Sequence, residues 1–443
     1  MAIFFALYTK NVIFSLFSGT LLGVFILNNF SIADSLLGTY DLFYSLFHEG
    51  WILKTLGFVI LVGSIMALIE KSGGIEGFIH FALHQKAFVS SPRSALMLSY
   101  ILGVVIFVET SITALISGAV GKPFCDKYKI PHAKLAFVCD STSAPIGSLV
   151  IVNGYGALLL GLITTQITAA GLEVNALELL IDSVLYNFYA MSALLVTFLY
   201  IWSGIDIGPM KHLSYKKSEN YIQVQAGSMY LMLLPIILML VLVFVFLYYT
   251  GDGDILKGSG SSSIFYTMLC VLAFMLVYYV GKGYMSFKEY ANTSFKGAKK
   301  LFGVSMILIF AFSIGKVTSD LKTGQYLATL ASDNLNAVFL AGVIFLLSSV
   351  ISFSTGTSWG TFSIMIPVAV PMALGLDANI ALVIGAVISG GIFGDHCSPI
   401  SDTTIISSMA ADCEVIEHVR TQLPYALISG AIALVLFLLM SIF

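Results

Sequence analysis

A polar run near the C-terminal end interrupts a stretch whose composition is otherwise that of a membrane-spanning helix. The run extends from Gly394 to Thr404 and contains two carboxylates, Asp395 and Asp402, a histidine and several hydroxyls. Each charged group at bilayer depth costs roughly 2.5 to 3.5 kcal/mol, so such groups indicate a functional site. Pro399 removes a backbone donor and leaves carbonyl oxygens free beside the carboxylates. The run therefore predicts a broken helix that carries an ion site.

The same pattern occurs earlier in the chain, where Cys139 to Pro145 interrupts the apolar run from Leu135 to Ile163. The acid of this copy is Asp140, and in both copies hydroxyl residues and then a proline follow the acid. Two copies in equivalent halves of the chain predict an internal repeat, with one broken helix in each half.

The composition places the chain among polytopic α-helical membrane proteins. Of its 443 residues, 58% are hydrophobic and 10% are charged, whereas soluble proteins carry about 25% charged residues. The apolar runs are continuous, which argues against a membrane β-barrel with its alternating strands. Five scattered cysteines show no metal-ligand spacing and predict free buried thiols rather than disulfides.

The N-terminal region is expected to begin with a retained helix rather than a cleaved signal. Val12–Leu27 is this first apolar run, and a loop carrying Asp34, Asp41 and Glu49 is expected after it. Met1–Tyr8 is too short to span a membrane, and we interpret it as the remnant of a missing helix, because the first half has one span fewer than the second.

Charged flanks predict two re-entrant hairpins. Basic residues stand at both ends of the apolar segment 94–121, so the chain is expected to enter and leave on one face, with Glu109 at the tip. A single long span with a buried glutamate is the alternative. Segment 338–373 repeats the pattern with acidic flanks and a serine- and threonine-rich tip. The two hairpins are thus predicted to open to opposite faces.

These elements predict an all-α polytopic fold of two inverted repeats, each with a hairpin and a broken transmembrane helix. The predicted parts are a first repeat at 1–205 with its hairpin at about 94–121 and its broken helix at about 135–163, a linker at 206–227, and a second repeat at 228–443 with its hairpin at about 338–373 and its broken helix at about 379–409. Most lysines and arginines fall on one side of this topology, which assigns that side and the N-terminus to the cytoplasm.

Carboxylates, hydroxyls and freed carbonyls are the ligands that hard cations prefer. Asp140 and Asp395 are the main candidates to hold such a cation and to couple it to protons, with Glu109 and Asp402 in support. A buried carboxylate can bind a proton or a cation but not both, which is the minimum chemistry of an antiporter. The positive ends of half-helices could equally face an anionic substrate. The residues predicted to line the site are Thr110, Ser111, Thr113, Ser141, Ser143, Ser354, Thr355, Gly356, Thr357, His396, Ser398, Pro399 and Ser401.

Other classes of protein fit the sequence less well. Asp395, His396 and Cys397 are zinc-ligand types, but consecutive residues on a helix do not face one another. A membrane hydrolase would need a GxSxG-type nucleophile with a positioned base, and neither is evident, so the chain is predicted not to be an enzyme. A channel usually arises from a ring of subunits, whereas internal symmetry favours alternating access. His396 is either a satisfied lining residue or a proton relay, and the hydroxyls either line the site or bond back to helix carbonyls.

Phe393 to Thr404 resembles the signature of the NhaC-type Na+/H+ antiporter family. The segment from His418 to Ala426 and the segment from Leu135 to Pro145 are also similar to that family, and the resemblance covers most of the chain. It implies the fold of the wider ion transporter superfamily, which includes dicarboxylate symporters: two inverted repeats, in a homodimer with a scaffold part and a moving transport part. One departure is that many members carry two adjacent acids near the first hairpin tip, where this chain has Glu109 followed by Thr110.

The predicted function is therefore exchange of Na+ for H+ across the inner or plasma membrane by alternating access. Na+ and H+ would be the transported ions, with no cofactor and no nucleic-acid partner. The resemblance also extends to exchangers of organic acids, such as malate for lactate, and to amino acid carriers. A Na+- or H+-coupled carrier of a carboxylate solute is accordingly the alternative.

Overall fold

The computed structural model is α-helical across the residues that it describes. These are residues 5, 8–9, 11–74, 77, 89–107, 110–151, 153–215, 227–253, 258–321, 326 and 337–442, so most of Met1–Tyr8 lies outside them. Within these ranges nine helices are long and apolar enough to cross a membrane, and one bent pair brings the count of spans to as many as ten. The chain is thus a multi-span α-helical membrane protein, as its composition predicts.

The elements follow the chain in two halves. The first half contains α2 (Val12–Leu27), α3 (Ile32–His48), α4 (Gly50–Lys71), α6 (Pro92–Val105), α7 (Thr110–Tyr128), α8 (His132–Leu149), α9 (Gly154–Ala169), α10 (Ala176–Leu185), α11 (Phe188–Ser203) and η2 (Gly208–His212). The second half contains α12 (Tyr230–Thr250), α13 (Gly260–Met275), η4 (Leu276–Val280), α14 (Phe287–Lys300), α15 (Phe302–Asp320), α17 (Ala337–Thr355), α18 (Ser358–Gly375), α19 (Ile380–Cys397), α20 (Asp402–Ala411) and α21 (Val415–Met440).

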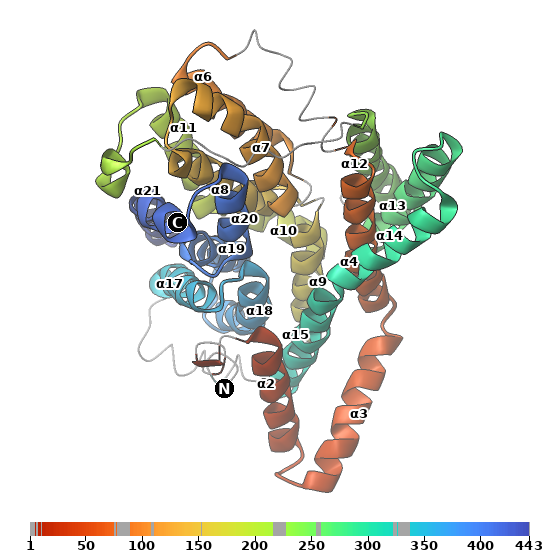
Figure 1. The fold of residues 1–443 in the computed structure, drawn as a ribbon. Coiled ribbons are helices and arrows are strands. Elements are labelled where there is room, and N and C mark those ends of the chain that lie inside the picture. The colour runs from red at the N-terminus through yellow and green to blue at the C-terminus, as the bar shows by residue number, and fades with distance from the viewer. Residues whose placement is uncertain are drawn as a thin grey trace.

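The helices gather in two groups (Figure 1). In the smaller group α4 contacts α13 and α14, and α12 contacts α13. The larger group includes α6 to α8, α11 and α17 to α21, in which α19 contacts α17, α18 and α21. Both α9 and α15 contact α4 on one side and α18 on the other, so these two helices connect the groups. Elements from both halves of the sequence contribute to each group.

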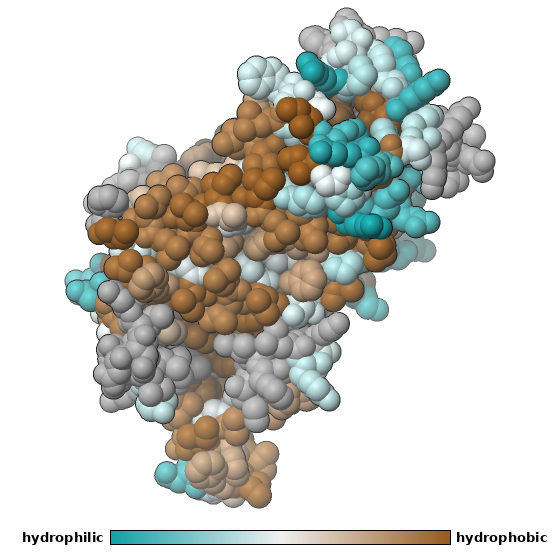
Figure 2. Space-filling view, turned by 90° about the vertical axis from the view of Figure 1, so that its left-hand side faces the viewer, coloured by the Kyte–Doolittle hydropathy of each residue, from teal (hydrophilic) through white to brown (hydrophobic). Residues whose placement is uncertain are grey.

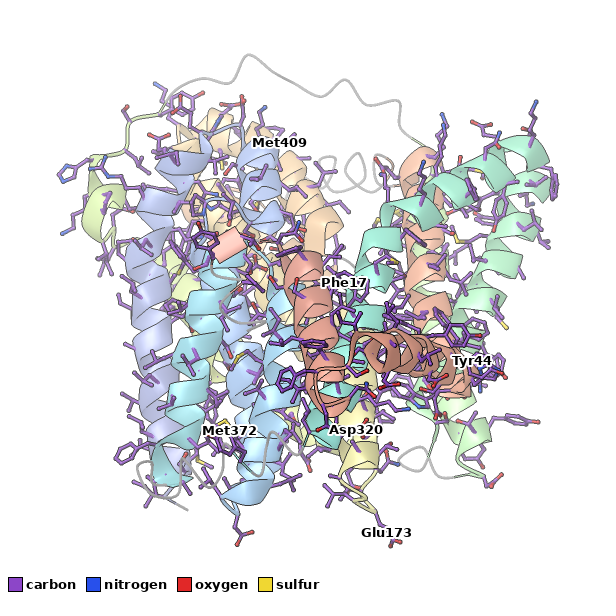
Figure 3. All side chains as sticks on the ribbon, turned by 90° about the horizontal axis from the view of Figure 1, so that it is seen from below. Phe17, Tyr44, Glu173, Asp320, Met372 and Met409 are labelled. Carbon is purple, nitrogen blue, oxygen red and sulfur yellow. The ribbon has the colours of Figure 1, made fainter. Side chains whose placement is uncertain are left out.

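The outer surface of the larger group is mainly apolar, and hydrophilic residues gather toward one end (Figure 2). In a side view Met409, at the end of α20, lies near one end of the molecule, while Glu173, Asp320 and Met372 lie near the other end (Figure 3). A broad apolar outer surface is the distribution expected of a protein that spans a bilayer.

The prediction of a loop after the first apolar run is wrong, because residues 32–48 form helix α3. Its start is capped by Ser31, whose side chain accepts a hydrogen bond from the backbone of Asp34, and His48 lies in its last turn. The acids that suggested a loop are compatible with a helix because only one stripe of α3 is buried, at Leu42 and Leu46. The helix lies across the direction of its neighbours (Figure 3).

The first predicted hairpin corresponds to α6 and α7, which pack against each other. The hydroxyl of Thr113 donates a hydrogen bond to the carbonyl of Ile106 and so ties the start of α7 to the end of α6. Glu109 lies outside the described residues. The second predicted hairpin corresponds to α17 and α18, each long enough to cross a membrane by length and composition. Re-entry of these pairs, and the inversion of the two halves, stay predictions.

The first broken helix is interrupted later than the sequence suggests. Pro145 lies inside α8, and the chain leaves the helix only after Leu149, where α8 and α9 meet at a bend of 40°. Asn153 stabilises the break, because its Oδ1 accepts from the backbone of Gly156 and its Nδ2 donates to the carbonyl of Gly147 at 2.7 Å. Pro145 removes only one helical hydrogen bond. The next turn of α8 is buried, and the helix continues through it to Leu149.

The second break is where the sequence predicts it, between Cys397 and Asp402 around Pro399. The turn between α17 and α18 packs against this break. Two features favour glycine at position 356. Its φ of +66° is rarely adopted by residues with a side chain, and a Cβ there would lie only 2.7 Å from Ile400. The Ser398 hydroxyl donates to the carbonyl of Phe353 at 2.9 Å, which fixes the turn to the break.

Candidate functional site

Asp140 is completely buried in the middle of α8. Its Oδ2 accepts hydrogen bonds from Thr404 Oγ1 of α20 at 3.0 Å and from Gln422 Nε2 of α21 at 2.8 Å. Among the described residues, its Oδ1 has no hydrogen-bond partner. A buried carboxylate oxygen without a partner is costly unless a proton or a cation satisfies it. Asp140 therefore has the properties of a group that binds one or the other.

Asp395, near the end of α19, is 1% exposed and has a similar environment. Its Oδ2 accepts a hydrogen bond of 2.9 Å from the hydroxyl of Ser358, the first residue of α18. That hydroxyl lies 2.7 Å from the hydroxyl of Tyr155 in α9. Oδ1 of Asp395 again has no partner in the described part of the chain. Both carboxylates thus present one satisfied and one unsatisfied oxygen.

The imidazole of His396 lies between the two carboxylate-bearing helices. Its Nδ1 lies 2.6 Å from the hydroxyl of Tyr189, and its Nε2 lies 3.2 Å from the hydroxyl of Ser141 and 3.9 Å from Oδ2 of Asp140. Each ring nitrogen therefore has a hydrogen-bond partner. The ring is also close enough to Asp140 for a direct electrostatic interaction.

Gln422 connects three groups, and its orientation follows from its partners. Its Nε2 donates to Oδ2 of Asp140 and, at 2.5 Å, to the carbonyl oxygen of His396, which can only accept. Its Oε1 must then accept the hydrogen bond of 2.9 Å from Nε2 of His418, so that nitrogen carries a proton. The other nitrogen of His418 lies 2.8 Å from the hydroxyl of Ser408. Nε2 of His418 is 3.8 Å from Oδ2 of Asp140.

Several residues predicted to line the site instead support the backbone around it. The hydroxyls of Ser143 and Thr355 bond back to the carbonyls of Asp140 and Ile351, both at 2.9 Å. Ser401 pairs with the hydroxyl of Thr403 at 3.1 Å. The predicted lining residues Ser354, Gly356, Thr357, Ser398 and Pro399 lie at the α17–α18 turn and at the break that faces it.

The structure brings the predicted acids that it describes close to one another. Asp140, Ser141, Asp395 and His396 share one buried region. Asp402 begins α20 with part of its surface exposed, is close enough to Asp395 and Asp140 to interact with them electrostatically, and accepts a hydrogen bond from the backbone of Thr403 at 2.9 Å. Thr110 begins α7. Glu109 and the side chain of Ser111 lie outside the described residues.

The structure adds partners that the sequence pattern did not identify. The direct partners of the carboxylates are Thr404, Gln422 and Ser358, and the residues behind them are His418, Tyr189 and Tyr155. A signal existed for two of them, because His418 and Gln422 are four residues apart and share one face of α21. Ser358 and Tyr155 each stand at or next to the first position of a helix that follows a break.

Comparison with known proteins agrees with this architecture. Residues 151–442 match the sequence model of the Na+/H+ antiporter family. The chain is 32% identical to an uncharacterized protein of Haemophilus influenzae, over 96% of this chain and 86% of that protein. It is 34% identical to the malate-2H+/Na+-lactate antiporter of Bacillus subtilis over 35% of this chain and 33% of that protein. The YdaH transporter of Alcanivorax borkumensis has the same fold, with a TM-score of 0.68 at 14% identity over 92% of this chain and 89% of that one.

Proposed function

The chain belongs to the Na+/H+ antiporter family, and we propose that it exchanges Na+ for H+ across a cell membrane by alternating access. The family match confirms the resemblance described in the sequence analysis. The chain is therefore a membrane transporter rather than an enzyme. The observation that carries the finer proposal is the pair of buried carboxylates, Asp140 and Asp395. Each keeps one oxygen without a partner among the described residues.

The surroundings of the carboxylates support a small hard cation as their ligand. Their described partners are hydroxyls, a side-chain amide and imidazoles, and in the described part of the chain no lysine or arginine forms an ion pair with either acid. A buried carboxylate without a basic partner is unstable as a bare anion, so it binds a proton or a cation. Na+ takes oxygen ligands, and each of the two acids supplies one carboxylate oxygen that has no partner among the described residues.

Competition for the same oxygens gives the exchange its stoichiometric coupling. A proton on Asp140 or Asp395 removes the charge that attracts Na+, and bound Na+ in turn displaces the proton. Alternating exposure of this region to the two sides would then move Na+ in one direction and protons in the other. The grouping of the helices into two bodies connected through α9 and α15 supports such a motion.

The experiment uses purified protein in liposomes that contain a pH-sensitive dye. With an acidic lumen, Na+ added outside should make the lumen more alkaline, and the apparent KM for Na+ should rise as the external pH falls. Absence of any Na+-dependent proton movement, without other solutes, between about pH 6 and 9 would show that the exchange proposal is wrong. The carboxylate carrier would then be the better assignment.

A further inference from the structure

The segment that joins η4 to α15 is strongly basic and takes no part in the candidate ion site. Between residues 282 and 300 it contains five lysines and a single acid, Glu289. Most of the segment forms α14, whose start is capped by Ser286, because the Ser286 side chain accepts a hydrogen bond from the backbone of Glu289. The Glu289 carboxylate pairs with Lys71 of α4 at 3.6 Å. The positive charge of the segment is therefore largely uncompensated within the segment itself.

One face of α14 packs closely against α4. Tyr290 and Gly297 are the buried residues of this face. A Cβ at Gly63 of α4 would lie 2.4 Å from the carbonyl oxygen of Gly297, so the two backbones are in direct contact. The hydroxyl of Ser64 also donates a hydrogen bond of 2.9 Å to the carbonyl of Ser294. These contacts hold α14 in a fixed position on α4.

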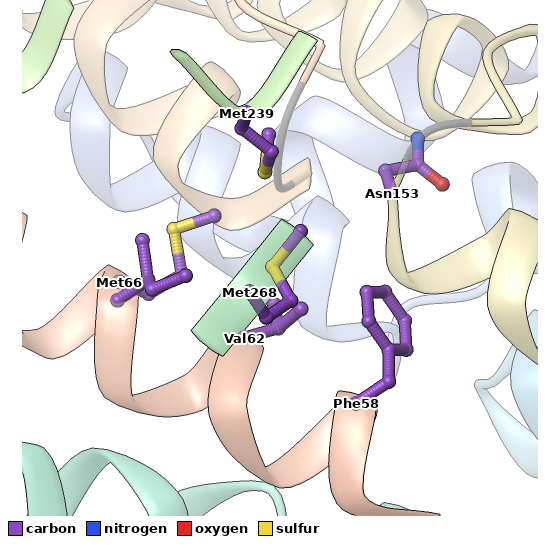
Figure 4. A pocket seen from close by; sticks show the side chains of 7 residues that line it. Phe58, Val62, Met66, Asn153, Met239 and Met268 are labelled. Atoms are coloured by element: carbon purple, nitrogen blue, oxygen red, sulfur yellow. The ribbon is translucent and has the colours of Figure 1, made fainter. Parts of the chain in front are cut away.

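Another face of α4 is covered by the rest of the smaller group. Phe58, Val62 and Met66 of α4 line a small apolar pocket together with Met239 of α12 and Met268 of α13 (Figure 4). Besides α4, the elements that α14 contacts most are η4 and α15, its neighbours along the chain. Helix α14 therefore forms an outer layer of the smaller group.

Two stripes of exposed side chains run along α14. The apolar stripe follows the helical spacing i, i+4, i+8 and i+11, and its members are Phe287, Ala291, Phe295 and Ala298. The basic stripe has the same spacing one residue later, about 100° around the helix, and its members are Lys288, Asn292, Lys296 and Lys299. None of these three lysines forms an ion pair with a residue that the structure describes, whereas Lys300 pairs with Glu70 at 3.3 Å.

The apolar stripe indicates that this side of α14 does not face water alone. Phe287 is 65% exposed and Phe295 is 73% exposed, and exposure of such rings to water loses the free energy that burial would provide. Acyl chains would bury both rings. The adjacent lysines would then lie at the level of the lipid headgroups, which is the arrangement of helices that lie in a membrane interface.

We propose that α14 binds the headgroup phosphates of anionic phospholipids through its basic stripe, while its apolar stripe enters the upper part of the acyl chains. Each lysine near an anionic membrane surface favours binding, and lysine binds phosphate as a point charge. A second copy of the chain on this face would bring two basic stripes together, and these repel each other. Through the contact between Gly63 and Gly297, bound lipid would hold α4 and the smaller group at the membrane surface.

A single tryptophan at position 295 reports on the lipids beside α14. The full-length variant carries Phe295→Trp with Trp51→Phe, Trp202→Phe and Trp359→Phe, in phosphatidylcholine vesicles that contain phosphatidylglycerol. Brominated acyl chains quench tryptophan on contact, so each lipid is brominated in turn. Phosphatidylglycerol should be preferred about tenfold at this position. Equal quenching by the two lipids would overturn the proposal, and so would quenching by neither, because a protein surface would then cover this face.

Charge variants test whether the basic stripe causes the preference. Combined Lys288→Gln, Lys296→Gln and Lys299→Gln should bring the preference close to one, whereas arginine at the same positions should retain it. The matched control removes the same charge from exposed lysines outside α14, by Lys127→Gln, Lys129→Gln and Lys211→Gln, and should keep the preference. A preference that survives in the stripe variant, or disappears in the control, would contradict the assignment.

Thermal unfolding of the protein with its natural tryptophans provides a second measurement. In a neutral detergent, phosphatidylglycerol should raise the unfolding midpoint and phosphatidylcholine should not, because a ligand that binds only the folded protein stabilises it. The increase should be absent from the variant with three glutamines in the basic stripe and present in the matched control. The same midpoint with both lipids would refute selective binding even if the single-tryptophan variant does not fold.

Discussion

Replacing Gln422 with leucine tests the buried hydrogen-bond network around Asp140. The change keeps a similar volume but removes both polar ends of the side chain. It deprives Asp140 of a charge-assisted hydrogen bond and leaves the carbonyl of His396 and Nε2 of His418 without their partner. A charge-assisted bond contributes about 1.5 to 3 kcal/mol and a neutral one about 1, so the expected total loss is roughly 3 to 5 kcal/mol.

The matched control is Gln166→Leu on α9. Gln166 is 4% exposed, but its Nε2 has no hydrogen-bond partner among the described residues. Removal of a buried amide whose nitrogen has no partner should cost less than removal of one whose nitrogen and oxygen are both hydrogen-bonded. Thermal unfolding of both variants in the same detergent should therefore give a clearly lower midpoint for Gln422→Leu than for Gln166→Leu. Equal midpoints for the two variants would refute the network as described.

Two further predictions concern the acids and the topology. Asp140→Asn and Asp395→Asn should each abolish Na+-dependent proton movement in liposomes while the protein stays folded, since in the described part of the chain neither acid forms an ion pair with a lysine or arginine. Exchange near the wild-type rate in either buried variant would remove that acid from the coupling site. Single cysteines at Ser91 and Tyr128, which flank α6 and α7, should both react with an impermeant thiol reagent from the cytoplasmic side. Labelling from opposite sides would replace the predicted re-entrant hairpin with a true span.

The sequence predicts the positions of the polar interruptions better than it predicts the contacts that they make. The cost of a charge at bilayer depth is a local property, so Asp140 and Asp395 could be identified from their apolar surroundings alone. The break at Pro399 follows from local backbone chemistry in the same way. Pro145 shows the limit of that rule, because burial of the following turn keeps α8 helical to Leu149.

The partners of the acids could not be predicted because they depend on how distant segments pack. Thr404 and Gln422 lie 264 and 282 positions from Asp140 in the sequence. Helical periodicity places Gln422 and His418 on one face of α21 but does not say which helix that face meets. The sequence does not predict helix α3 for a different reason. The acids of this segment suggest an exposed loop, and the buried stripe that would indicate a helix consists of only two leucines.

The hydrogen bonds of Asp140 have a mechanical consequence. Through Oδ2 they fasten α8 to α20 and α21, and through the carbonyl of His396 the amide of Gln422 adds α19 to the same body. These four helices come from both halves of the sequence, yet one buried hydrogen-bond network connects them. In the proposed alternating-access motion, a displacement of Asp140 would therefore carry all four helices together. The contacts of the larger group with α9 and α15 run mainly through α18, so α18 is where relative movement would be expected.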